Sequence, residues 1–149
     1  MISMLYKINH FIATGFYTGK ISRAPGTYGS LLALILLIIF PFLKNSNSVI
    51  IFFIIGVFSS SYEAYISGKK DKGEVVIDEI TGIFLTFINI PLTPFYLIIG
   101  FILFRILDIF KPPPINSSQK LPSGLGVMID DILAGLISLG ILNILIFIK

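Results

Sequence analysis

The stretch 126-GVMIDDILAGLISLGILNILIFI-148 combines a long apolar run with two adjacent aspartates, Asp130 and Asp131, near its start. It exceeds the roughly 20 apolar residues that a helix needs to cross a bilayer. Carboxylates inside a membrane are costly, and two neighbouring ones on a helix cannot both face lipid, so we expect at least one to point into protein. The stretch therefore predicts a membrane helix that begins with a polar, protein-facing end.

Shorter apolar runs of the same kind make up much of the remaining chain. They cover residues 28–43, 49–68, 75–90 and 95–110. Of the 149 residues, 55% are hydrophobic and only 13% are charged, and the mean hydropathy of +0.95 exceeds that of water-soluble domains. Because lipid offers no hydrogen-bond partner to a backbone, each run must be helical. We therefore expect an all-α fold, a polytopic membrane helical bundle with about four to five embedded helices, in a single domain over residues 1–149.

The charged residues orient these runs in the membrane. If the N-terminus lies inside and the chain crosses five times, nine cations fall at or near the inner face and two outside, as the positive-inside rule prefers. The inner cations are Lys7, Lys20, Arg23, Lys69, Lys70, Lys72, Arg105, Lys111 and Lys120, and the outer ones are Lys44 and Lys149. The acids fall at the inner helix ends as well: Glu63, Asp71, Glu74, Asp78, Glu79, Asp108, Asp130 and Asp131. We expect a multi-pass protein of a bacterial inner membrane with a site on its cytoplasmic face.

The scarcity of cysteine and histidine narrows the chemistry. The chain has no cysteine, which excludes thiol nucleophiles and Cys-ligated metals. His10 is its single histidine, so neither a His-based metal site nor a Ser-His-Asp triad is expected, and we place His10 at the membrane interface. The net charge of +3 is modest, which fits membrane topology rather than a nucleic-acid partner. The chemistry is left to carboxylates, hydroxyls and cations.

The acids at the start of the run 75–90 are candidates for a metal site. Asp78 and Glu79 precede an apolar stretch, where unpaired carboxylates are expensive. On a helix, Asp71, Glu74 and Asp78 follow i, i+3 and i+7 spacing and would share one face. The alternatives are a solvated helix start for Asp78 and Glu79, where acids suit the helix dipole, and plain surface charge for the other two. A divalent cation would relieve the repulsion among these acids and the adjacent aspartates of the last run.

Two basic segments are candidates for phosphate binding. Arg105, Asp108 and Lys111 repeat at i, i+3 and i+6, which presents a cation, an anion and a cation on one helix face. This spacing favours a phosphate clamp beside a metal-binding aspartate, with a structural Arg–Asp pair as the alternative. Hydroxyls and cations also crowd the segment before residue 31, where a helix N-terminus would complete an anion cradle: Lys20, Arg23, Thr27 and Ser30. The alternative there is a structural loop whose basic residues bind lipid headgroups.

Four ordered blocks of sequence carry most of these candidates. They are Arg23-Ala24-Pro25-Gly26-Thr27 with Gly29-Ser30; Gly73-Glu74-Val75-Val76-Ile77-Asp78-Glu79 with Gly82; Phe104-Arg105 with Asp108, Lys111-Pro112 and Pro114; and Gly124-Leu125-Gly126-Val127-Met128-Ile129-Asp130-Asp131 with Ala134-Gly135. Together they resemble the phosphatidylglycerophosphatase A family. The blocks span residues 23–135, and four blocks in order are far more specific than one motif.

The resemblance implies a Mg²⁺-dependent phosphatase that converts phosphatidylglycerophosphate, a membrane phospholipid, into phosphatidylglycerol. Together with the basic segment described above, it leads to an expected site with three groups of residues. The catalytic residues are Asp78, Asp108, Asp131, Arg105 and Lys111; the metal ligands are Asp78, Glu79, Asp130 and Asp131; and the phosphate-binding residues are Lys20, Arg23, Thr27 and Ser30. The sequence leaves the oligomeric state open, a homo-oligomer included.

A membrane transporter or ion-conducting protein is the alternative function, because clustered intramembrane carboxylates also form ion paths. Such a protein would spread its acids through the depth of the membrane. The acids of this chain are instead expected at one end of the helices, which favours the phosphatase.

Overall fold

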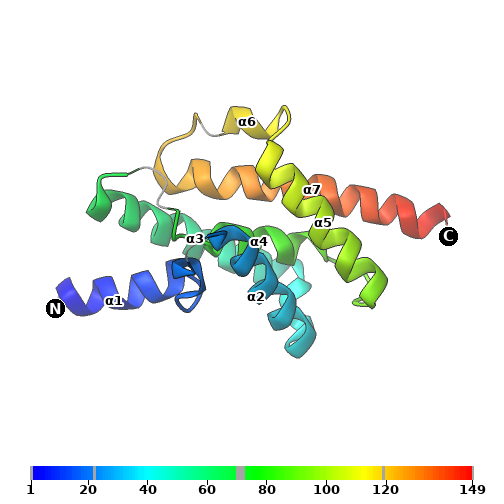
Figure 1. Cartoon of the computed structure of the whole chain (residues 1–149), viewed down its shortest axis with the longest axis horizontal. Coiled ribbons are helices and arrows are strands. Elements are labelled where there is room, and N and C mark those ends of the chain that lie inside the picture. Colours follow the sequence, from blue (N-terminus) through cyan, green and yellow to red (C-terminus); the bar gives the residue numbers. More distant parts are fainter. Residues whose placement is uncertain (1, 22, 70–72, 119, 149) are drawn as a thin grey trace.

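The computed structural model describes residues 2–21, 23–69, 73–118 and 120–148. In chain order its elements are α1 (Ile2–Ala13), the 3-10 turn η1 (Thr18–Lys20), α2 (Pro25–Ile39), the 3-10 turn η2 (Pro41–Lys44), α3 (Ser46–Ser67), α4 (Ile77–Thr86), α5 (Pro94–Phe110), α6 (Ile115–Ser118) and α7 (Ser123–Ile148). No strand occurs in these residues, so the predicted all-α fold is confirmed for them. Figure 1 shows α7 running along much of the molecule, with α4 near the centre.

Four other helices pack around α4. Nine of its ten residues are buried, and it contacts α2, α3, α5 and α7. A helix that is buried on all sides is surrounded by protein. Its ten residues rise about 15 Å, half of a bilayer core of about 30 Å. The prediction of one continuous helix over residues 75–90 is therefore wrong. The chain leaves the helix after Thr86 and turns, with Phe87 and Ile90 buried in protein, where irregular backbone is tolerated.

Two helices are long and apolar enough to cross a membrane, over Ser46–Ser67 in α3 and Gly124–Ile148 in α7. The helices α2 and α5 are also apolar, but they have only 15 and 17 residues. Both lengths lie below the roughly 20 residues of a full crossing. The described residues thus contain two candidate crossings, and the expectation of four to five embedded helices stays a prediction.

Local signals explain where several helices begin and end. The side chain of Asn45 precedes α3 and accepts a hydrogen bond of 2.8 Å from the backbone N–H of Ser48. The same helix ends at Gly68, whose φ of 68° is a left-handed conformation that glycine adopts without steric cost. Pro94 occupies the first position of α5, where a backbone N–H would have no partner within the helix.

The N-terminal helix α1 is not foreseen by the apolar runs. It packs against α3 through a buried polar cluster, in which Asn9 Nδ2 donates a 3.1 Å hydrogen bond to Glu63 Oε1. His10 Nδ1 lies 3.2 Å from the same oxygen. The exposed fraction is 6% for His10 and 1% for Glu63. The predicted interfacial position of His10 is therefore wrong, because Glu63 gives the ring a buried hydrogen-bond partner.

The helices α4 and α7 approach so closely that only glycine fits where they cross. A Cβ on Gly135 would lie 2.7 Å from the carbonyl oxygen of Gly82, and a Cβ on Gly82 would lie 2.9 Å from the carbonyl oxygen of Asp131. Small residues of this kind let helix backbones pack tightly. Since Gly82 follows Asp78 by about one helical turn, the crossing holds Asp131 near Asp78.

We expect Gly135→Ala to destabilise the protein by about 1–3 kcal/mol, because the added methyl group meets backbone that cannot move away cheaply. Gly140→Ala is the matched control on the same helix, since a Cβ there would meet nothing within 4 Å. That control should leave stability unchanged or raise it by about 0.5–1 kcal/mol. Thermal unfolding in detergent measures both variants. Equal midpoints for the two would contradict this account of the crossing.

Candidate active site

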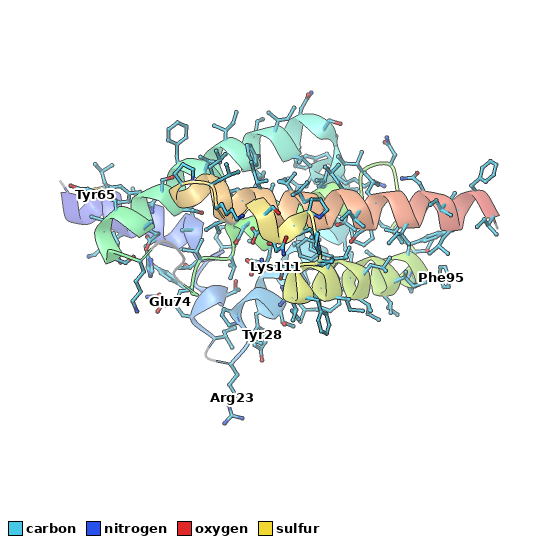
Figure 2. The ribbon with its side chains drawn as sticks, turned by 90° about the horizontal axis from the view of Figure 1, so that it is seen from above. Arg23, Tyr28, Tyr65, Glu74, Phe95 and Lys111 are labelled. Carbon is cyan, nitrogen blue, oxygen red and sulfur yellow. The ribbon has the colours of Figure 1, made fainter. Side chains whose placement is uncertain are left out.

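A cavity of about 490 Å³ lies where the polar ends of four chain segments meet. Its walls come from the first turn of α2, the segment 73–79, the end of α5 and the first half of α7. Figure 2 shows Lys111 in the middle of this region. The lining residues are Ala24, Pro25, Gly26, Gly73, Val75, Asp78, Glu79, Arg105, Asp108, Lys111, Gly126, Val127, Asp130 and Asp131. Every predicted catalytic residue and every predicted metal ligand is among them.

Three carboxylates converge on one side of the cavity. Asp78 and Glu79 come from the first turn of α4 and Asp131 from α7, and one oxygen of each lies within 4.8 Å of the others. Glu79 Oε2 and Asp131 Oδ2 are buried and accept no hydrogen bond from any described residue. Like charges held this close favour a bound cation, and hard divalent cations prefer carboxylate oxygens. These three residues therefore fit a divalent-cation site.

Two cations lie on the other side of the cavity, each paired with aspartate. Arg105 Nη1 donates a 2.5 Å hydrogen bond to Asp108 Oδ2. Lys111 Nζ lies 3.2 Å from Asp108 Oδ1 and 2.5 Å from Asp130 Oδ2. It also lies 4.0 Å from Asp131 Oδ1. Arg105 and Asp108 thus form the ion pair that the sequence left open as the alternative to a phosphate clamp. Of the two adjacent aspartates, Asp131 lies with Asp78 and Glu79, while Asp130 pairs with Lys111.

The backbone of Lys111 explains how its side chain reaches α7. Lys111 caps the C-terminus of α5 with a φ of 45°, a left-handed conformation that usually falls to glycine. Strain of this kind persists where the surrounding structure requires it. Burial acts to lower the pKa of Lys111, but Asp131, Asp130 and Asp108 outweigh it and hold the pKa well above the usual range. The ammonium group is therefore charged in the cavity.

Two sequence predictions about the acids are wrong in their local structure. We expected Asp130 and its neighbour to open the last helix, but α7 begins at Ser123 and has no acid in its first turn. The helix starts earlier because Gly124 packs against α3 and its N–H donates to Ser61 Oγ at 3.2 Å. The two aspartates therefore lie beyond the first turn of α7, outside the region where the helix dipole favours acids.

The predicted helical face of acids before α4 is also not formed. Because α4 begins only at Ile77, Glu74 lies in a turn before it and does not share a helical face with Asp78. The side chain of Glu74 instead lies 3.9 Å from His10 Nε2. Asp71, the third member of the predicted face, lies outside the described residues.

The four residues that were expected to bind phosphate do not line the cavity. They are Lys20, Arg23, Thr27 and Ser30. Lys20 lies 5.0 Å over the ring of Tyr17, and Ser30 Oγ donates to the carbonyl oxygen of Gly26 at 2.7 Å. Figure 2 shows Arg23 projecting away from the body of the molecule. Phosphate binding by these four residues stays a prediction.

Sequence reasoning missed the role of Gly26 in the cavity wall. A Cβ on this residue would collide with Glu79 Oε1 and would lie 2.9 Å from Arg105 Nη1. The first turn of α2 thus presses against both the carboxylate side and the cation side. The Pro25-Gly26 pair at a helix start was the available signal, because proline suits the first turn and glycine allows close approach.

Comparison with known proteins identifies the family. A model of the family described as phosphatidylglycerophosphatase A matches residues 11–146. The chain belongs to this family. The matched range of the phosphatidylglycerophosphatase A family includes every residue that lines the cavity.

Several curated relatives are similar over most of their length. Phosphatidylglycerophosphatase A of Escherichia coli (strain K12) is 39% identical over 138 residues, which cover 89% of this chain and 80% of the relative. The protein of the same name from Haemophilus influenzae is 40% identical over 141 residues, which cover 91% and 86%. A relative from Bacteroides thetaiotaomicron, provisionally named a phosphatidylinositol-3-phosphatase, is 36% identical over 138 residues, which cover 85% and 86%. No solved structure matches the chain.

We expect Lys111→Met to lower the free energy of unfolding by about 1–3 kcal/mol, because it leaves buried aspartates without their cation. Adding Asp130→Asn to this variant should recover part of the loss, since the uncompensated charge is then removed. Lys120→Met, at an exposed lysine of the same connecting segment, is the control and should change little. Chemical denaturation of the four proteins, wild type included, gives the comparison. A double variant no more stable than Lys111→Met would contradict the Lys111–Asp130 pairing.

Proposed function

We propose that this chain is a membrane phosphatase, one domain over residues 1–149, that hydrolyses phosphatidylglycerophosphate to phosphatidylglycerol and phosphate. The observation that carries the proposal is the cavity in which three carboxylates face two cations. Carboxylates suit a divalent cation, and Arg and Lys suit a phosphate monoester. The names of the relatives from Escherichia coli and Haemophilus influenzae support the substrate.

The residues divide into metal ligands and phosphate ligands in this proposal. Asp78, Glu79 and Asp131 would hold Mg²⁺, which when bound would offset the negative charge of the phosphate oxygens. Arg105 and Lys111 would bind the same phosphate group and orient it. Asp108, at hydrogen-bond distance from both cations, positions them. In the reaction, water supplies the oxygen that joins phosphorus, the bond from phosphorus to the glycerol oxygen breaks, and that oxygen takes up a proton.

We also propose that the chain is a multi-pass protein of a bacterial inner membrane with the cavity on the cytoplasmic side. Lys44 Nζ donates a 2.5 Å hydrogen bond to the carbonyl oxygen of Ile90, so the turns after α2 and after α4 meet at one end. The charged cavity lies toward the opposite ends of these helices, at the first turns of α2 and α4. This separation, together with the bias of cations toward the inner segments, supports the orientation.

Two observations bear on other functions. Five of the eight acids of the chain line this one cavity, which argues against an ion path that spreads carboxylates through the membrane. The name of the relative from Bacteroides thetaiotaomicron points to phosphatidylinositol 3-phosphate as a second candidate substrate. Both lipids carry a phosphate monoester on their headgroup, so the same cavity chemistry would serve either one.

Purified protein in detergent micelles should release phosphate from phosphatidylglycerophosphate when Mg²⁺ is present, and the release should stop after chelation with EDTA. Asp78→Asn should lower the rate by about 10²-fold or more, because it removes charge from the carboxylate group. Glu74→Gln is the matched control, since this side chain is 44% exposed and does not line the cavity. Phosphatidylinositol 3-phosphate is assayed in parallel.

Faster release from phosphatidylinositol 3-phosphate would move the substrate assignment to that lipid. Equal rates for Asp78→Asn and Glu74→Gln would place the chemistry outside the cavity. Folded protein that releases phosphate from neither lipid would overturn the proposed function.

Binding of Mg²⁺ can be measured without turnover. Mg²⁺ should raise the thermal midpoint of the substrate-free protein, because a ligand at about 100 times its Kd stabilises the folded state by about 2.7 kcal/mol. The shift should vanish in Asp131→Asn, which loses one of the three converging carboxylates, and persist in Glu74→Gln. Sodium chloride at matched ionic strength controls for screening. An undiminished shift in Asp131→Asn would contradict the assigned ligands.

A further inference from the structure

Two of the helices that line the cavity carry a stripe of exposed apolar side chains. On α2 the stripe is Tyr28, Leu31, Ile35 and Ile38, which are 41%, 41%, 53% and 57% exposed. On α5 it is Ile98, Ile102, Ile106 and Ile109, which are 60%, 48%, 47% and 63% exposed. Spacings of three and four residues place each set on one side of its helix. Exposed apolar side chains gathered in this way mark a surface that contacts a membrane, a ligand or another protein.

Both stripes begin at the wall of the cavity. Tyr28 follows the lining residues Pro25 and Gly26 by less than a turn of α2, and Ile106 directly follows the lining residue Arg105 on α5. The two helices meet there, since a Cβ on Gly26 would lie 2.9 Å from Arg105 Nη1. Figure 2 shows Tyr28 beside the Lys111 end of α5, with Phe95 at the far end of that helix. The charged cavity is thus continuous with apolar surface on these two helices.

The other elements of the cavity wall offer no such continuation. The side chains of α4 beyond Glu79 are buried throughout. On α7, Leu136 is the first exposed large apolar residue after the two aspartates, and it lies more than one turn beyond Asp131. The exposed apolar residues of α3, such as Ile54, belong to a helix that contributes no lining residue.

We infer that the acyl chains of the phospholipid substrate lie along the α2 and α5 stripes while its phosphate monoester occupies the cavity. The inference rests on the proposed function and adds a binding subsite to it. A phospholipid carries its charge and its hydrocarbon at opposite ends, which matches a cavity with two cations that opens onto apolar helix surface. The headgroup reaches the carboxylates sideways, past the first turn of α2 and the last turn of α5, and the hydrocarbon stays in the membrane.

Site-specific labelling tests this route, because the chain contains no cysteine. The variants Tyr28→Cys and Ile106→Cys lie on the stripes, and Ile54→Cys, at a residue 50% exposed on α3, is the matched control. Each is assayed before and after reaction with a bulky maleimide, on diacyl phosphatidylglycerophosphate and on its deacylated, water-soluble analogue. The label on either stripe should lower the diacyl rate about tenfold or more and leave the rate on the analogue unchanged, because binding energy from the chains is lost. The labelled control should keep both rates.

A second measurement needs no turnover. Phosphatidylglycerophosphate with a photoreactive group in its acyl chain is irradiated with the wild-type protein in the presence of EDTA, and the labelled peptides are mapped. Adducts within residues 25–39 and 94–110 should disappear when excess unlabelled substrate competes. Adducts within residues 46–67 should persist, because there the photoreactive lipid contacts the helix without occupying a specific site.

Competable adducts confined to α3 or α7, or the absence of any competable adduct, would overturn the inference. Equal loss of rate on both substrates, or an equal loss in the labelled control, would overturn it as well. These outcomes differ from failure of the proposed function, which shows as an absence of phosphate release by the unlabelled wild-type protein.

Discussion

The balance of charge among the side chains of one cavity is the constraint on which the rest of the structure depends. Removing a carboxylate from water costs several kcal/mol unless an opposite charge or a hydrogen bond compensates it. Arg105 and Lys111 supply two such charges, and both lie on the side of Asp108 and Asp130. The oxygens of Asp78, Glu79 and Asp131 converge on the other side. The proposed Mg²⁺ would neutralise the charge of these three carboxylates, so the same residues would serve both stability and catalysis.

This constraint accounts for the unusual position of α4. Its first turn must deliver two acids to the cavity, and its remaining residues are buried among four other helices. A helix that spans a bilayer needs roughly 20 residues. The close contact between α4 and α7 at Gly82 instead fixes where Asp78 and Glu79 lie along the bundle. The chain can leave the helix after Thr86 because the surrounding helices bury the irregular backbone that follows. A short central helix thus brings carboxylates to one level of the bundle.

Composition and the apolar runs were enough to predict an all-helical fold, and the positions of the acids were enough to single out the carboxylates of the cavity. The placement of Asp78, Glu79, Asp108 and the two adjacent aspartates beside apolar residues is a strong signal, because unpaired carboxylates are costly there. Hydropathy could not separate α4 from a lipid-facing helix, since burial in protein and burial in lipid select the same side chains. The burial of His10 was likewise hidden, because it depends on Glu63, which is 53 residues away in the sequence.

The wall between α2 and α5 shows how the site and the membrane surface constrain each other. A lipid phosphatase must keep hydrocarbon away from its charged groups and still admit a headgroup that is attached to hydrocarbon. Gly26 lets the first turn of α2 lie close to the cavity, because it has no side chain. Any side chain at Gly26 would press on Glu79 and Arg105 at once. The absence of a side chain at Gly26 therefore lets the first turn of α2 approach the carboxylate side and the cation side of the cavity together.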